Sequence, residues 1–589
     1  MSTGLDFQSL PRYQKRTFVT DDVDLTNVEQ ATWFYKLLLD RDIHSQMDLE
    51  RWVLDRSELE AAISQAGSIL YISMTCQTDN FKCAEDYKRF IETVAPAVKP
   101  LEDELNQRYL EELKRFPLEE NRYGVYIRRI KMNLEIFVPA NVDLQTKVDL
   151  LSQEYQTVCA VMTVKFEGQE KTLPQMAKYL FEPNRGIRES AWQVIAKRRL
   201  QDKDKLNELF DQMFKLRNQI AQNVGCKNFC EYKFKSAHRF DYTPKDCYQY
   251  HSAVEKLVIP LWSDILKARA KQLKLKQLRP WDLAVDPQGL AALKPFEKVE
   301  KLISGCQEIF NRMDGQLGRQ FSDMVQKGLL DLDSRKGKAP GGYQNTLDES
   351  RKPFIFMNAV GVDDDVRTLL HEAGHAFHAL ACAQDPLLDY RHGPMEFNEV
   401  ASMAMELLAD ENLDVFYDQD QHNRSTVSHL EDIVFTLGWV ATVDAFQHWL
   451  YEHPGHTVSQ RNEQWIKIRH RFAGDLVNWD GLEEEHAYLW HRQLHIFEYP
   501  FYYIEYGIAQ LGALQLWLNS KKNFRKALAN YYHGLSFGGA RPLPELYKAS
   551  GIQFDFSERT IAPLIEILRE ELMKKNSFFN SSLNKVVYN

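Results

Sequence analysis

The ten residues His371-Glu-Ala-Gly-His-Ala-Phe-His-Ala-Leu380 contain the pattern H-E-x-x-H, with His371, Glu372 and His375 in its fixed positions. Residues four apart lie on the same face of an α-helix, so both imidazoles can reach one metal ion. Glu372 is then placed to act on a metal-bound water rather than on the metal itself. In a long chain with 17 histidines, chance produces this pattern in roughly a few per cent of cases. The sequence around it therefore has to show whether it is a metal site.

The residues before and within the motif predict the helix that it requires. Asp363, Asp364 and Asp365 supply an N-cap and negative charge at a helix start. The residues that follow give this helix an apolar side beside the motif histidines: Val366, Leu369, Leu370, Ala373, Phe377 and Leu380. The pattern H-E-x-x-H thus falls inside a well-marked helix.

A small sheet is predicted just before this helix, around residues 328–358. Turn-forming residues are frequent from Gly328 to Tyr343, and the apolar run Pro353-Phe-Ile-Phe-Met-Asn358 follows them. An exposed edge of this sheet could pair with an extended peptide by strand addition. A purely structural hairpin fits the same residues equally well, so the sequence leaves both interpretations open.

A catalytic zinc site needs a third protein ligand, and the next predicted helix, which begins near Pro394, carries three acidic candidates. Glu399 and Glu406 are seven residues apart and share a face, whereas Glu396 lies in the first turn, where the helix dipole favours a surface acid. A buried carboxylate needs a partner. Glu399 as the ligand, with Glu406 holding a ligand histidine from behind, gives a partner to both acids. The residue pattern favours Glu399 over Glu396 by only a modest margin.

A second group of candidate residues follows His486. Tyr499, Tyr503 and Tyr506 have the spacing i, i+4 and i+7, and Pro500 suits the first position of a helix. The sequence therefore predicts a row of phenols along one helical side. An aromatic stripe in a core is the usual interpretation of such a row. A metallopeptidase, however, needs neutral hydrogen-bond donors for the oxyanion that forms when a peptide is attacked, and these phenols are candidates for that role.

The composition is that of a soluble globular protein. Of the 589 residues, 44% are hydrophobic and 26% are charged, and the net charge of −10 argues against a general nucleic-acid binder. No secretory signal is visible, and no stretch approaches the roughly 18 apolar residues of a membrane-spanning helix. The eight scattered cysteines fit reduced thiols. We therefore expect a cytoplasmic protein that binds neither nucleic acid nor membranes.

The periodicity along the chain predicts a mainly helical protein. Long amphipathic helices are expected from Leu25 to about Phe116, a short strand pair near residues 161–169, and helices again from Leu173. We expect residues 1–175 to form an N-terminal helical lobe and residues 176–589 to form the domain that carries the metal motif.

The metal motif and the acids after it resemble the signature of a known family. His371-Glu-Ala-Gly-His-Ala-Phe-His378, followed by Phe397-Asn-Glu-Val-Ala-Ser-Met-Ala-Met-Glu406, is similar to the zinc signature of the thimet oligopeptidase and oligoendopeptidase F family of metallopeptidases. The segment Pro500-Phe-Tyr502 is closer to the oligoendopeptidase F branch. In keeping with this, Ile496-Phe-Glu498 stands where thimet oligopeptidase has a glycine-rich loop.

The resemblance implies roles for two sets of residues. The first set binds one Zn²⁺ per chain and supplies the general base: His371, His375 and Glu399 as ligands, and Glu372 as the base. The second set acts on the peptide: Tyr506 and His495 at the transition state, and Tyr499 and Tyr503 in substrate binding. His378 also fits the family pattern but is not a ligand there.

For the whole chain, the resemblance implies a mainly α, two-lobed helical clamshell with a deep substrate channel. It also implies a zinc-dependent oligoendopeptidase, which hydrolyses internal bonds of short, unstructured peptides by attack of a zinc-bound water that Glu372 activates. We expect a monomer or a small homo-oligomer. A zinc carboxypeptidase of related helical fold has the same ligands and stays open as an alternative. So does a non-catalytic peptide-binding protein on this scaffold, although loss of Glu372 would then be expected.

Overall fold

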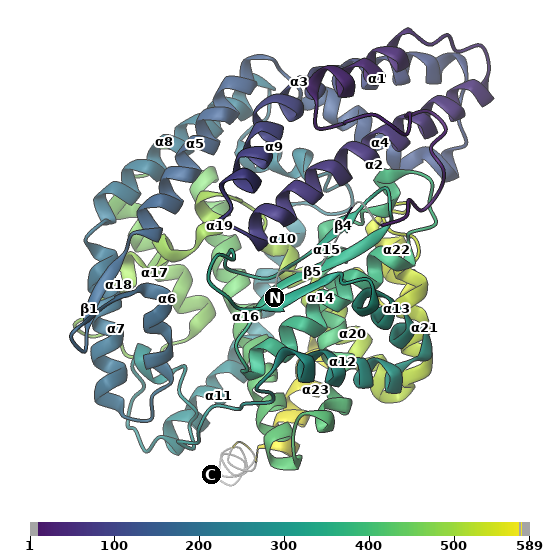
Figure 1. Ribbon diagram of the computed structural model, residues 1–589. Coiled ribbons are helices and arrows are strands. Elements are labelled where there is room, and N and C mark those ends of the chain that lie inside the picture. Colours follow the sequence, from purple (N-terminus) through teal and green to yellow (C-terminus); the bar gives the residue numbers. More distant parts are fainter. Residues whose placement is uncertain (1–6, 8–9, 577–578, 580–589) are drawn as a thin grey trace. The chain divides into compact units, whose positions relative to one another are not determined.

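The structure is a computed structural model that describes Phe7, residues 10–576 and Phe579 (Figure 1). The chain forms two compact units, and each unit is assembled from three separate segments. The first unit comprises Met1–Glu135, Lys294–His422 and Gly512–Phe554, and the second comprises Ile136–Leu293, Asn423–Leu511 and Asp555–Asn589. The chain passes between the two units at residues other than 175, where the sequence predicts a domain boundary. That boundary stays a prediction.

The first unit begins with four helices: α1 (Val28–Asp40), α2 (Gln46–Cys76), α3 (Phe81–Arg115) and α4 (Glu120–Ile136). The side chains of Asn27, Ser45 and Asn80 accept backbone N–H groups in the first turns of α1, α2 and α3, which fixes where these helices begin. Trp52 of α2 is fully buried, and its Nε1 donates to the carbonyl of Leu38 in α1 at 2.9 Å. The helices thereby share one apolar core.

A three-stranded sheet follows in the same unit, formed by β3 (Leu330–Asp333), β4 (Tyr343–Leu347) and β5 (Lys352–Ala359). The strand order is β3-β5-β4, with β5 parallel to β3 and antiparallel to β4. The buried ammonium of Lys338 donates to the carbonyls of Asp331, Asp333 and Met357, which ties the loop before β4 to the sheet. This sheet lies next to α14 (Asp363–Ala381), as the sequence predicts (Figure 1).

Helices make up most of the remainder of the first unit. Their bounds are α12 (Val299–Met313), α13 (Gly315–Gln326), η5 (Leu388–Arg391), α15 (Met395–Leu408), η6 (Asp410–Val415), α21 (Phe524–Leu535) and α22 (Leu543–Ala549).

The second unit is helical except for one antiparallel strand pair, β1 (Thr163–Phe166) and β2 (Gln169–Thr172), among its described residues. The strands meet at the turn Glu167-Gly168, where both residues have positive φ, and the pair confirms the prediction near residues 161–169. Its helices are α5 (Ala140–Ala160), α6 (Leu173–Met176), η2 (Ala177–Phe181), α7 (Arg185–Leu200), α8 (Lys203–Asn223), α9 (Phe229–Ser236), α10 (Pro244–Ala253), η3 (Val254–Val258), α11 (Ile259–Gln272), η4 (Pro280–Asp282), α16 (Gln419–Glu452), α17 (Val458–Ala473), α18 (Glu483–Ala487), η7 (Leu489–Arg492), α19 (Leu494–Phe497), α20 (Ile504–Lys522) and α23 (Glu558–Lys575). Two of these helices, α16 and α20, have some of their residues in the first unit.

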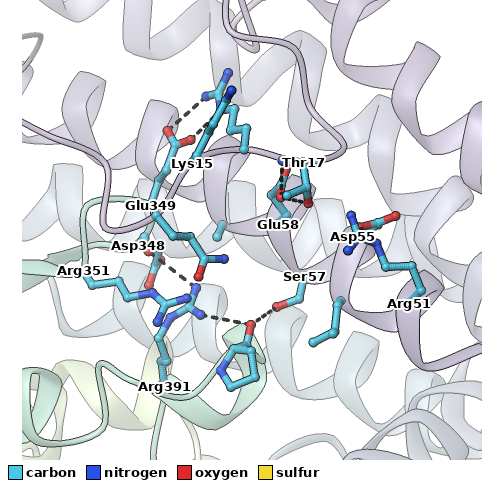
Figure 2. A pocket seen from close by; sticks show the side chains of 15 residues that line it. Lys15, Thr17, Arg51, Asp55, Ser57, Glu58, Asp348, Glu349, Arg351 and Arg391 are labelled. Carbon is cyan, nitrogen blue, oxygen red and sulfur yellow. Dashed lines mark hydrogen bonds and ion pairs between the residues drawn. The ribbon is translucent and has the colours of Figure 1, made fainter. Parts of the chain in front are cut away.

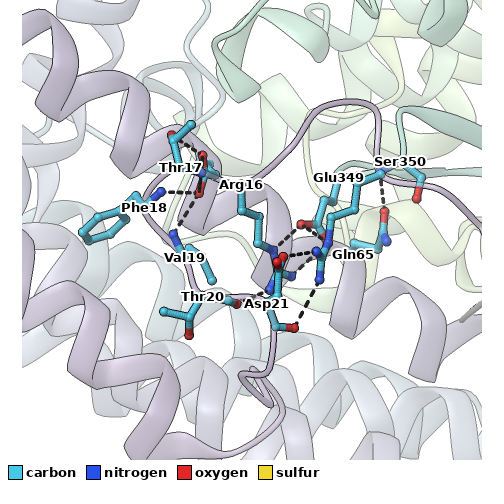
Figure 3. Close-up of polar contacts among 11 residues, drawn as sticks. Arg16, Thr17, Phe18, Val19, Thr20, Asp21, Gln65, Glu349 and Ser350 are labelled. Atoms are coloured by element: carbon cyan, nitrogen blue, oxygen red, sulfur yellow. Dashed lines mark hydrogen bonds and ion pairs between the residues drawn. The ribbon is translucent and has the colours of Figure 1, made fainter.

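The segment before α1 is held in the first unit by two acidic side chains. Glu58 of α2 accepts the backbone N–H groups of Thr17, Phe18 and Val19, with N–O distances of 2.8 to 3.0 Å. Figure 2 shows its contact with Thr17. Arg16 donates two hydrogen bonds to the carboxylate of Glu349, in the turn between β4 and β5 (Figure 3). A cavity of about 320 Å³ lies beside these contacts; most of its lining residues are charged or polar, and the motif histidines are not among them.

The chain is thus mainly α, with a small sheet beside the motif helix, as predicted. All eight cysteines are free thiols. None of the helices in the described part of the chain combines the length and apolar character that a membrane crossing requires.

Candidate active site

The motif helix α14 has the capped start that the sequence predicts, and Asp365 provides it. Its Oδ2 accepts the N–H groups of Val360, Gly361 and Val362 at 2.8 to 2.9 Å. A carboxylate here satisfies backbone donors ahead of the helix and also interacts favourably with the positive end of the helix dipole. The arginine of the next turn, Arg367, is buried and pairs with Asp410 at 2.8 Å, which links α14 to η6. The helix that carries the motif is therefore fixed at its beginning.

Three candidate ligand atoms converge between α14 and α15. Nε2 of His371 lies 3.5 Å from Oε2 of Glu399, and Nε2 of His375 lies 3.7 Å from the same oxygen. All three donor atoms lie within 4.8 Å of one another. Zinc bonds of about 2.0–2.2 Å at tetrahedral angles separate two donors by about 3.4 Å. The donor set and its spacing therefore fit one zinc ion.

Two further side chains orient these donors. Glu406 lies two turns after Glu399, and its Oε1 is 2.6 Å from Nδ1 of His371 and accepts a hydrogen bond from it. The other ring nitrogen, Nε2, is thereby directed at Glu399. The hydroxyl of Ser402 donates to Oε2 of Glu399 at 3.0 Å. A carboxylate behind a ligand histidine is the usual outer partner in zinc sites. The geometry places Glu406 where the sequence predicts it; Ser402 was not predicted, although its position three residues after the ligand puts it on the same helical face.

The charges around the histidines differ between the two rings. Burial lowers the pKa of His375 to about 4, so this imidazole is neutral near pH 7 and its lone pair is available to a metal. Burial also acts to lower the pKa of His371, but Glu399 and Glu406 outweigh it and raise the pKa. A divalent cation held by these donors would displace that proton, because metal and proton compete for the same nitrogen.

Glycine at position 374 allows α14 and α15 to approach closely. A Cβ built on Gly374 would lie 2.6 Å from the carbonyl oxygen of Ala401 and 2.6 Å from Cα of Ser402. No side chain fits there without moving the backbone of α15. Gly374 stands at a variable position of H-E-x-x-H and so went unnoticed in the sequence, but it sets the distance between the two ligand helices.

Glu372 is buried on α14, with 7% of its surface exposed. Burial raises the pKa of Glu372 to about 7, while the charge of His371 and the backbone N–H of Gln344 in β4 act in the opposite direction. A carboxyl group in such a place can take up and release a proton near neutral pH. The strand β4 thus contributes directly to the surroundings of the candidate base.

Two other residues that the sequence brought into question lie outside the donor set. His378 is buried, its Nε2 has no hydrogen-bond partner among the described residues, and burial lowers its pKa to about 3. Glu396 is in the first turn of α15, but only 4% of its surface is exposed, so the expectation of a surface acid was wrong. Tight packing of α15 overrides the preference that its position in the first turn suggests.

The predicted tyrosines form a cluster in the second unit, but not a row on one helix. Helix α20 begins only at Ile504, so Tyr506 alone is helical, and Tyr499 and Tyr503 precede it in turns. Around His495 the ring centroids of Tyr503 and Tyr506 lie at 4.8 and 6.0 Å, while Tyr499, at 6.3 Å, is 53% exposed. The prediction of one helix was wrong because buried Phe501 has φ 63°, a left-handed conformation that interrupts helical geometry.

Two buried arginines hold this corner of the second unit in place. Arg217 of α8 donates to the carbonyls of Ile496 and Phe497, and Arg239 donates to the carboxylate of Glu505 at 2.7 Å and to the carbonyl of Phe501. Backbone carbonyls outside helices need such donors when they are buried. The sequence shows both arginines but gives no sign of these partners, which lie far away along the chain.

Tyr502 also belongs to the cluster. Its ring centroid lies 5.7 Å from that of His495 and 5.3 Å from that of Tyr506. The sequence analysis did not select it, although position 502 is three residues after Tyr499 and four before Tyr506 and so shares their face of an ideal helix. The candidate metal ligands belong to the first unit and the cluster around His495 to the second.

The sequence model of peptidase family M3 matches residues 179–564, which include both sets of residues. The chain belongs to peptidase family M3. Curated relatives include an oligoendopeptidase F homolog of Borreliella burgdorferi, 24% identical over 54% of this chain and 54% of its own length. Oligopeptidase PepF of Bacillus subtilis is 22% identical over 67% of this chain and 58% of its own length. The chain thus spans about half the length of the curated relatives it matches.

Solved structures extend the similarity over nearly the whole chain. PZ peptidase A with an inhibitor has a TM-score of 0.85 and 25% identity, and the match covers 95% of this chain and 100% of that one. An oligoendopeptidase F structure has a TM-score of 0.84 and 26% identity, with 96% and 100% covered. These similarities confirm the resemblance to the oligoendopeptidase F branch of the M3 family.

Proposed function

We propose that the chain is a zinc-dependent endopeptidase that hydrolyses internal bonds of short, unstructured peptides. The observation that carries this proposal is the set of three donor atoms on α14 and α15, with the carboxyl group of Glu372 next to the first of them in sequence. Membership of the M3 family and the similarity to oligoendopeptidase F support it.

His371, His375 and Glu399 would hold one Zn²⁺. When bound, this ion would polarise the carbonyl of the scissile bond and lower the pKa of a water toward neutrality. Glu406 orients the ring of His371, and Ser402 orients the carboxylate of Glu399, so both helices present their donors with little freedom.

Glu372 acts as the general base in this proposal. Its carboxylate takes a proton from the attacking water and later delivers it to the nitrogen of the leaving amine. Its burial and the backbone N–H of Gln344 restrict the orientation of the carboxylate. Proton transfer through one fixed group accounts for both halves of the reaction without a covalent intermediate.

Tyr506 and His495 are proposed to donate hydrogen bonds to the tetrahedral oxyanion, and Tyr499 and Tyr503 to contact the substrate. The family resemblance supports these roles, as does the way His495 and the phenol rings gather at one corner. Burial lowers the pKa of His495 to about 4, so near pH 7 it acts as a neutral donor. Loss of one oxyanion donor typically costs about 3 kcal/mol of transition-state stabilisation, and Tyr506→Phe is expected to lower kcat accordingly.

The edge of β4 that has no strand partner supports an extended peptide as substrate. β4 pairs with β5 on one side and has no second strand neighbour among the described residues. A peptide could add to this edge through main-chain hydrogen bonds, which do not depend on its sequence. This position places the peptide close to Glu372, because Gln344 belongs to β4.

The test combines zinc content with cleavage of quenched peptides of increasing length. We expect one zinc per chain at this site and internal cleavage that fades for long or folded substrates. Glu372→Gln should retain zinc and lose activity; persistent cleavage by that variant would refute the mechanism. Removal of residues only from the carboxyl end of the peptides would instead indicate a carboxypeptidase.

Two glutamates of α15 provide a matched pair for the ligand assignment. Glu399→Gln should lose zinc, whereas Glu396→Gln, an equally buried change outside the donor set, should keep it. The opposite result would refute Glu399 as the third ligand.

A further inference from the structure

A second group of metal-binding side chains lies in the second unit. Cys247 of α10 and Asp444 and His448 of α16 place one donor atom each within 4.8 Å of one another. All three residues are buried, with 1% or less of their surface exposed. None of them takes part in the proposed peptidase reaction, so the inference below stands independently of that proposal.

Two donor atoms of this group lack ordinary partners. Oδ1 of Asp444 and Nε2 of His448 are buried and have no hydrogen-bond partner within the described residues. Nε2 of His448 lies 3.4 Å from Oδ2 of Asp444. This distance exceeds the roughly 2.7–2.9 Å of a charge-assisted hydrogen bond, and it equals the separation of about 3.4 Å between two donors on one tetrahedral zinc ion.

Neighbouring polar groups orient the side chains of His448 and Asp444. The hydroxyl of Tyr248 donates to Glu452, so its oxygen can only accept from Nδ1 of His448, which lies 3.4 Å away. Nδ1 therefore carries a ring hydrogen. Burial acts to lower the pKa of His448, but Asp444 outweighs it and raises the pKa, so without a metal Nε2 also carries a proton, which a bound metal ion would displace. Nε2 of His251 lies 2.8 Å from Oδ2 of Asp444 and holds that carboxylate from the other side. Such outer partners are typical of metal sites.

We propose that Cys247, Asp444 and His448 bind a Zn²⁺ ion, through the cysteine sulfur, a carboxylate oxygen and Nε2. Thiolate, imidazole and carboxylate are all zinc ligands. Binding would release the thiol proton of Cys247 and the Nε2 proton of His448 to solvent, and one thiolate and one carboxylate would then neutralise the charge of the ion. A neutral cluster removes the cost of burying an unpaired charge. The ion would join α10 to α16, two helices far apart in the sequence.

Cys230 marks the limit of the proposed site. Its sulfur lies 3.7 Å from Nδ1 of His448, on the side of the ring opposite to the proposed metal. It therefore contacts the ligand histidine but does not bind the ion. This difference between two neighbouring buried thiols is what the test exploits.

Cobalt provides a readout that separates this site from the peptidase site. A thiolate ligand gives bound Co²⁺ a charge-transfer band in the near ultraviolet, and the set His371, His375 and Glu399 contains no thiolate. Full-length protein loaded with Co²⁺ should bind two ions per chain and show the band. His375→Ala, which disables the first site, should bind one ion and keep the band. Failure of the proposed function would change the first ion only.

Substitutions of three buried cysteines complete the test. Cys247→Ser should lose the band and one ion, whereas Cys230→Ser and the control Cys306→Ser, in the first unit, should keep both. A band that survives in Cys247→Ser would overturn the assignment. If Cys247→Ser does not fold, the His375→Ala protein still decides the question, since absence of a bound ion and of the band in that protein refutes the site.

Discussion

Replacement of Gly374 by alanine should disturb the candidate zinc site although residue 374 is not a ligand. The added Cβ would lie 2.6 Å from the carbonyl oxygen of Ala401 and from Cα of Ser402, where ordinary contact begins at 3.4 Å. The backbone of α15 must therefore move away by about 0.8 Å, a change that protein interiors do not absorb freely. Glu399 is only two residues before Ala401, so its carboxylate moves with the helix.

The size of the effect follows from two opposing terms. Alanine is favoured over glycine inside a helix by about 1 kcal/mol, whereas overpacking a core typically costs about 1–3 kcal/mol. Ligand distances tolerate changes of only about 0.2 Å, so a shift of about 0.8 Å affects zinc more than it affects folding. We expect zinc affinity to fall at least as much as on loss of an outer partner of a ligand, which is about 10–100-fold.

Gly124→Ala in α4 is the matched control. A Cβ at residue 124 would contact only the flexible side chain of Glu120, at 2.9 Å, and no backbone atom. Gly124→Ala therefore gains the stabilisation that alanine gives a helix without requiring the backbone to move. Zinc affinity measured by competition with a chelator, and unfolding in urea, should place Gly374→Ala below this control in stability by about 1–3 kcal/mol. Zinc affinity within twofold of the unsubstituted protein would refute the argument that Gly374 sets the distance between the ligand helices.

Three further predictions concern charged groups. Glu406→Gln should weaken zinc binding about 10–100-fold by releasing the ring of His371, and unchanged affinity in a chelator competition would contradict this. Burial acts to raise the pKa of Glu58, but the N–H groups of Val19, Phe18 and Thr17 outweigh it and lower the pKa from 4.5. The ionised carboxylate therefore stabilises the fold above about pH 4.5, and this stabilisation is lost as the pH falls through the lower pKa of the folded state. Glu58→Gln should flatten the acid side of a stability–pH profile measured by urea unfolding. Asp282 is fully buried and pairs with Arg185 and Arg188. Asp282→Asn leaves buried Arg188 without its counter-charge and should lower the free energy of unfolding by about 3–5 kcal/mol. The control Arg185→Gln changes a side chain that is 38% exposed and should lower the free energy of unfolding far less.

The parts of the site that follow helical periodicity could be predicted from the sequence. Spacings of four and seven residues placed His371 with His375 and Glu399 with Glu406, because an α-helix repeats every 3.6 residues. The same rule failed for Tyr499 and Tyr503, because the left-handed backbone of Phe501 separates them from the helix. Gly374 was missed for a different reason: its importance lies in the distance to α15, and a spacing within one helix carries no information about the neighbouring helix.

Buried cations explain how non-helical segments near the candidate residues keep their shape. Carbonyls within helices find partners locally, whereas those of buried loops do not. Lys338 satisfies three carbonyls around the sheet next to α14, and Arg217 satisfies those of Ile496 and Phe497 in the corner beside His495. A hydrophobic residue at either position would leave these carbonyls without donors, at a cost of about 1–3 kcal/mol for each unsatisfied group. The two cations therefore belong to the support of the candidate site, although neither is expected to touch a substrate.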